Sequence, residues 1–115
     1  MKILLVFFAL FSQVVFSQNL ELNHLQKQFD QETKSPKKLE ILNEMVQHAF
    51  DFDLKKALEL SRKGVQLAEN SNNKEWLPKF LEIQGRMHAN MLELDSAVFY
   101  FDKAIENYKI TNNQE

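Results

Sequence analysis

The chain has 115 residues, 14 basic and 16 acidic side chains, and no cysteine. This length allows one domain. The mild acidity argues against nucleic-acid binding, which needs a clustered basic face. The lack of cysteine excludes disulfide bonds and an anchor attached to an N-terminal cysteine. We therefore expect one small domain that is stabilised by packing alone.

The first seventeen residues have the pattern of a secretory signal peptide (1–17). Lys2 gives a positive start, residues 3–16 are almost wholly apolar, and Ser17 offers a small residue for cleavage before Gln18. The apolar run of about 14 residues is shorter than the ~20 that a membrane-spanning helix needs, so a cleaved signal is favoured over an uncleaved anchor. We expect an exported chain, periplasmic or secreted, whose mature form has a net charge of −3.

Helical spacing of apolar residues runs through the rest of the chain, which has only two glycines and two prolines. This pattern predicts an all-α fold. We expect about five helices after the signal peptide, over residues 20–31, 36–50, 54–70, 74–91 and 96–109. Helix-capping side chains are predicted at Ser35, ahead of Pro36, and at Asp53, Asn73 and Asp95.

Each predicted helix carries one apolar face. In chain order these faces comprise Leu22, Leu25 and Phe29; Leu39, Leu42, Met45, Val46 and Ala49; Leu54, Ala57, Leu58, Leu60, Val65 and Leu67; Trp76, Phe80, Ile83, Met87 and Met91; and Val98, Phe101, Ile105 and Tyr108.

The mature sequence repeats itself with a period of 40 residues. The offset matches Ala57 with Ala97, Gly64 with Ala104, His48 with His88, and Asn72–Asn73 with Asn112–Asn113. A fixed period of about 20–50 residues is typical of proteins built from stacked repeats. Each unit comprises a helix, a tight turn, a second helix and a polar break, and the break at residues 111–113 is expected to repeat that at 71–73.

Small residues recur where two helices would have to cross closely. They are Ala57, Gly64, Gly85, Ala97 and Ala104, and Phe101 is placed to fill an adjoining gap. A glycine inside a helix costs about 1 kcal/mol relative to alanine, and close backbone approach can offset that cost. We expect these residues to be repeat-packing positions.

This spacing resembles the tetratricopeptide repeat (TPR) over residues 36–115. The family positions fall on Leu81, Gly85, His88, Leu94, Ala97, Phe101 and Ala104 in the second unit, and on Ala57 and Gly64 in the first. The first unit departs from the pattern at Met45, His48 and Ser61, and the second departs at Gln84. The family unit has about 34 residues, so this chain is similar to the longer variety found in exported and sensor proteins of the Bacteroidetes group.

The resemblance implies a right-handed solenoid of antiparallel helix pairs, with a capping helix and loop at 18–35, a first repeat at 36–73 and a second at 74–115. The first helix of each pair would line a concave groove. Its residues in the second repeat would be Lys79, Glu82, Arg86, Ala89 and Asn90. The first-repeat counterparts are Leu39, Leu42, Val46, Ala49 and Phe50, an apolar set that we expect the 20–31 helix to cover.

No pattern in the sequence indicates catalysis or a cofactor. His48 and His88 share a repeat position, and only His24 could join them, whereas a zinc site needs three or four ligands. The carboxylate pairs Asp51/Asp53 and Glu93/Asp95 sit at predicted helix starts, where capping explains them. We expect a chain that is not an enzyme and binds no metal.

Three functional hypotheses remain open. The first is a protein-interaction module that holds a peptide or partner helix in the groove, with Lys79 and Arg86 facing acidic groups and Asn90 facing backbone amides. The second is the N-terminal sensor segment of a longer signalling protein, such as a histidine kinase or transcription regulator, because stacked repeats usually need three or more units. The third is homodimerisation through the C-terminal helix, where Phe99, Phe101 and Ile105 otherwise lack cover. A membrane association is expected only through an uncleaved N-terminal segment or a further C-terminal part.

Overall fold

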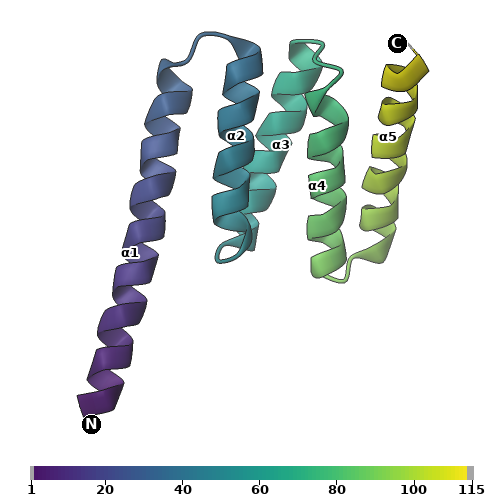
Figure 1. Cartoon of the computed structure of the whole chain (residues 1–115). Helices are drawn as coiled ribbons and strands as arrows, with labels where there is room; N and C mark the ends of the chain where they lie inside the picture. The colour runs from purple at the N-terminus through teal and green to yellow at the C-terminus, as the bar shows by residue number, and fades with distance from the viewer. Residues whose placement is uncertain (1, 114–115) are drawn as a thin grey trace.

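The computed structural model describes residues 2–113. In this range it contains five helices and no strand: α1 (Lys2–Gln31), α2 (Ser35–Phe50), α3 (Leu54–Asn70), α4 (Trp76–Asn90) and α5 (Leu94–Asn113). Consecutive helices run in opposite directions and pack on one another (Figure 1). The predicted all-α class is confirmed. Met1 of the predicted signal peptide and residues 114–115 of the predicted second repeat lie outside the described residues.

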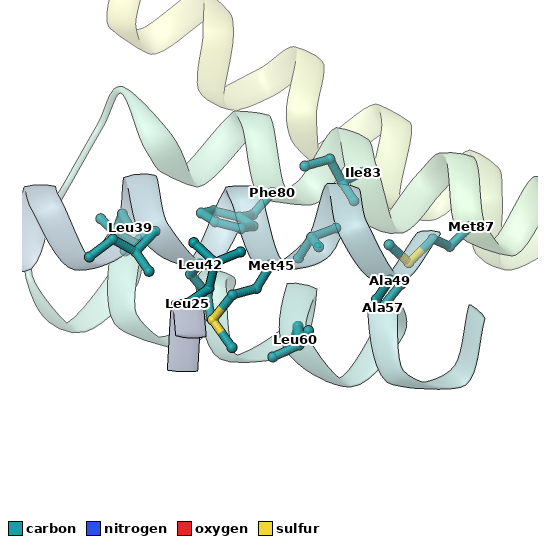
Figure 2. Packing of buried hydrophobic residues seen from close by; sticks show 13 residues of the cluster. Leu25, Leu39, Leu42, Met45, Ala49, Ala57, Leu60, Phe80, Ile83 and Met87 are labelled. Carbon is teal, nitrogen blue, oxygen red and sulfur yellow. The ribbon is translucent and has the colours of Figure 1, made fainter. Parts of the chain in front are cut away.

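The hydrophobic core joins α1, α2, α3 and α4 (Figure 2). Its largest contributors are Leu39, Leu42, Met45, Leu60, Phe80 and Met87, all of them fully enclosed. Burying such a side chain contributes about 1.5–3 kcal/mol, so these residues hold the array together. The apolar set predicted for the first groove is enclosed as expected at Leu39, Leu42, Val46 and Ala49.

The first helix is longer than the sequence pattern predicts. We expected a leader over 1–17 and a separate helix over 20–31, but α1 runs without a break from Lys2 to Gln31. Nothing between these segments stops a helix, since no glycine or proline occurs there. Only the second half of α1 packs on the array, through Leu22, Leu25 and Phe29. The first half extends beyond the other helices (Figure 1).

Two turns close in the same way, with a left-handed residue after the helix end. Asn72 (φ 52°) follows α3, and Leu92 (φ 60°) follows α4. Behind α3 the amide of Asn73 donates to the Ala68 carbonyl at 2.8 Å, and behind α4 the amide of Glu93 donates to the His88 carbonyl at 2.9 Å. These bonds satisfy carbonyls that a helix end leaves unpaired. Asparagine tolerates this conformation, whereas leucine is strained in it.

Helix capping follows the prediction at one of four positions, where the Asp53 carboxylate accepts from the Lys56 amide at 3.0 Å. The Asn73 prediction is wrong, because α4 begins at Trp76 directly after Glu75, although the Asn73 carboxamide oxygen still accepts from the Trp76 amide at 2.9 Å. The Ser35 prediction is wrong, because α2 already includes Ser35 and has no side-chain cap. The Asp95 prediction is also wrong, because α5 begins one residue earlier and Asp95 lies in its first turn.

The C-terminal helix differs from its counterpart α3 in two respects. The predicted break at Thr111–Asn113 is wrong, because α5 continues through it to Asn113. In the first unit the break is made by the left-handed backbone of Asn72, and Asn112 does not adopt that conformation. In addition, Val98 and Ile105 were predicted to face inward but are 57% and 51% exposed.

Candidate binding surfaces

The five predicted groove residues Lys79, Glu82, Arg86, Ala89 and Asn90 share one side of α4, which we call the α4 stripe. Glu82, Arg86 and Asn90 are exposed, and Lys79 and Ala89 are half-buried. The opposite and flanking faces of α4 are buried against α3 and α5. The spacing of three to four residues along a helix explains why they form a continuous surface.

Some of the stripe's polar groups already have partners. The Lys79 ammonium lies 3.5 Å from a Glu75 carboxylate oxygen and 4.7 Å from the centre of the Trp76 ring. Glu82 accepts a hydrogen bond of 3.0 Å from the Tyr108 hydroxyl of α5. Burial, and then this hydrogen bond to Glu82, raises the pKa of Tyr108 above its ordinary value.

Arg86 and Asn90 are the stripe residues with side chains available for a ligand. Neither makes an ion pair or side-chain hydrogen bond to any residue in the range 2–113. Arg86 also lies near enough to Tyr108 to oppose the rise in its pKa. A planar guanidinium suits carboxylates, and a carboxamide can pair with backbone amides.

The small residues singled out by the repeat occupy helix crossings. Ala57, Gly64, Gly85, Ala97 and Ala104 are all buried. A Cβ on Gly64 would come within 2.6 Å of the Phe80 Cγ and closer to the ring edge, and a Cβ on Gly85 would lie 2.7 Å from the Phe101 Cδ1. Each glycine thus accommodates a phenylalanine ring from the next helix.

His88 has an environment that its repeat position did not reveal. His48 is exposed, whereas His88 is buried and stacks on Tyr100, with ring centres 5.1 Å apart. The His88 Nδ1 lies 2.8 Å from a Glu93 carboxylate oxygen, and its Nε2 has no hydrogen-bond partner among residues 2–113. His24 is exposed on α1 and contacts Gln28. No group of three or more metal-binding side chains comes together within the described range.

Two apolar surfaces remain uncovered. On the first half of α1, ten large apolar side chains between Ile3 and Phe16 are more than half exposed. By length and composition alone, α1 could cross a membrane. On α5, Leu94, Val98 and Ile105 form an exposed stripe, which we call the α5 stripe. Phe101, expected to be uncovered, is instead half-buried over Gly85.

One hollow has charged side chains in its lining. It has a volume of about 610 Å³ and lies between the start of α2 and the turn that follows α3. Lys37 and Glu40, which line it, pair with each other at 3.0 Å. These two charges are therefore already partnered, and Lys34 is the other charged residue in the lining.

Comparison with protein-family models, with curated proteins and with solved structures finds no match to this chain.

Proposed function

We propose that the chain is a non-catalytic protein-interaction module of TPR type, which binds a peptide or partner helix along the α4 stripe. The observation that carries the proposal is the exposure of Arg86 and Asn90 on one face of α4 with no partner inside the described chain. The other faces of α4 pack against neighbouring helices, so the residues of the α4 stripe can be substituted without disturbing the core. An acidic ligand suits this surface, since the Arg86 guanidinium has no ion-pair partner among residues 2–113.

A charge-reversal experiment tests this surface. The double variant Lys79→Glu/Arg86→Glu is compared with the wild type by pull-down from the exporting cell, with the captured proteins identified by mass spectrometry. The matched control is Lys63→Glu/Lys109→Glu, which makes the same charge change at exposed positions on α3 and α5. We expect the first variant to lose its partners and the control to keep them. Unchanged partners in the first variant would rule out the stripe.

Export of the chain is supported by the apolar, unpacked first half of α1. A signal peptide need not pack on the mature protein, and cleavage before Gln18 leaves Leu22, Leu25 and Phe29 attached to α2. Mass spectrometry of the N-terminus is the test. A chain beginning at Gln18 in the periplasm or medium supports export, and an intact chain in the membrane fraction indicates an anchor.

The α5 stripe favours a second candidate function, self-association or attachment of further helices. Exposed apolar surface of this kind marks contact sites. If the chain dimerises through the α5 stripe, light scattering at increasing protein concentration should give twice the chain mass. The double variant Val98→Lys/Ile105→Lys should then be monomeric. In the sensor version, the same stripe is covered by later helices of a signalling protein. An open reading frame continuing past Glu115 would support the sensor version, and a natural stop codon there would exclude it.

A further inference from the structure

A second hollow surface lies on the side of α4 opposite the α4 stripe. It has a volume of about 300 Å³, α3 and α5 form its walls, and Gln84 of α4 forms part of its floor. Gln84 is two residues from both Glu82 and Arg86, and two residues on an α-helix point about 200° apart. This hollow, the α3–α5 groove, is therefore separate from the proposed stripe.

The side chain of Gln84 is unusual for its position. Gln84 is only 3% exposed, yet its side chain makes no hydrogen bond to any residue between 2 and 113. Among the described residues only His88 Nε2 is a fully enclosed side-chain nitrogen or oxygen without a partner, so the exposed part of Gln84 includes its carboxamide atoms. Because Gln84 lines the groove, what remains exposed of it opens there. Its donor and acceptor are available to a group that enters the groove.

The side chains that line the middle of the groove walls are mainly cationic and aromatic. Arg62 on α3 and Lys103 on α5 both lie on the third turn of helices that start at the same end of the array (Figure 1). Neither is ion-paired within the described chain. The Lys103 ammonium lies 5.3 Å from the centre of the Phe99 ring, which also lines the groove. Glu69 is the one acidic residue, two turns beyond Arg62.

We propose that the α3–α5 groove binds an extended acidic segment of a partner protein. The Gln84 carboxamide pairs with a backbone amide of the segment, while Arg62 and Lys103 flank one of its carboxylates. Charge complementarity selects the occupant, since two unpaired cations face one acid. The inference rests on the proposed interaction function but places recognition on the opposite side of α4.

Amide NMR of the isotope-labelled chain, as isolated from expressing cells, tests the proposal. The probe is a blocked hexapeptide of alternating glutamate and alanine, and the control probe carries lysine in place of glutamate. We expect the glutamate peptide to shift the Gln84 side-chain amide and the backbone signals of Arg62, Glu69, Phe99 and Lys103. The lysine peptide should leave these signals unchanged. No shift at the groove, or shifts with both peptides, would overturn the proposal.

Variants separate this groove from the α4 stripe. Gln84→Leu and, independently, Arg62→Gln/Lys103→Gln should each weaken the glutamate peptide at least tenfold, and Gln84→Leu should keep or raise the thermal midpoint. Lys63→Gln/Lys109→Gln, which removes the same charge at exposed positions outside both the groove and the α4 stripe, should bind the peptide as the wild type does. Wild-type affinity in both groove variants would overturn the proposal. Shifts confined to the α4 stripe would overturn it while leaving the proposed function standing.

Discussion

Two helix contacts in this chain use the same device but differ in how completely they are enclosed. Phe80 of α4 packs over Gly64 of α3, and Phe101 of α5 packs over Gly85 of α4. Phe80 is fully buried because α2 also contributes to the cluster around it, whereas Phe101 stays half-exposed at the edge of the array. The most fully enclosed part of the core therefore lies in α2 to α4, and α5 packs on α4 at the edge of the array.

The largest expected effect on stability comes from removing the rings of Phe80 and Phe101. Phe80→Ala should lower the free energy of unfolding by about 3–5 kcal/mol, because it leaves a cavity in the core. Phe101→Ala should cost about 1–2 kcal/mol, because part of its ring is already in water. Urea unfolding followed by circular dichroism measures both, with the more exposed Phe99→Ala as the control. Equal losses for Phe80 and Phe101 would contradict the comparison.

Replacing the two glycines by alanine should give a smaller difference in stability. Gly64→Ala should destabilise by about 1–2 kcal/mol, because overpacking against the immobile Phe80 ring exceeds the gain of about 1 kcal/mol in helix propensity. Gly85→Ala should change stability by less than about 1 kcal/mol, since Phe101 can turn toward solvent. Thermal unfolding measures both. Phe80→Leu in the Gly64→Ala background should recover part of the loss, and additivity of the two changes would argue against the ring contact.

The two left-handed turn residues offer a gain in stability. Leu92 is 82% exposed, so its side chain contributes little packing in exchange for its strained backbone. Leu92→Gly should stabilise the chain by about 1 kcal/mol, and Asn72→Gly by only a few tenths, because asparagine already tolerates this conformation. Chemical unfolding at equilibrium measures the difference. Destabilisation by Leu92→Gly would mean that the exposed leucine has a packing role after all.

The smallest expected effect is a pH dependence of the α4–α5 contact. Because burial and Glu82 raise the pKa of Tyr108, the folded chain holds the phenolic proton more tightly than the unfolded chain. This contribution is fully present below the unfolded pKa, near 10, and is lost as the pH rises through the higher folded value. Urea midpoints between pH 8 and 11 should fall more for the wild type than for Tyr108→Phe. An equal fall in the urea midpoint for both proteins would show that ionisation of Tyr108 does not weaken the α4–α5 contact.

The fold class and most helix positions follow from the sequence because apolar periodicity survives wherever a helix is packed on both sides. The 54–70 prediction, for example, coincides with α3. The periodicity misleads on α5, where Val98 and Ile105 continue the helical pattern but are more than half exposed. It also fails at Asn112, since a repeated asparagine does not by itself impose a left-handed backbone.

The candidate surfaces were only partly predictable. The stripe from Lys79 to Asn90 follows from helical spacing, because the polar side of an amphipathic helix can be counted along the chain. The α3–α5 groove could not be found this way, since it depends on Arg62 of α3 and Lys103 of α5 lining one hollow from different helices. The one advance signal was Gln84, a polar residue at a position where the repeat pattern prefers an apolar one.

Native-state hydrogen exchange tests most directly the claim that α2 to α4 form the stable part of the array and α5 its looser edge. Exchange of individual amides is followed by NMR under native conditions, and the protection of the Ala104 amide on α5 is compared with that of the Gly64 amide on α3. We predict that α5 amides exchange through a partial opening of lower free energy, while α2, α3 and α4 amides exchange only on global unfolding. Equal protection of the two helices, or greater protection of α5, would contradict the account.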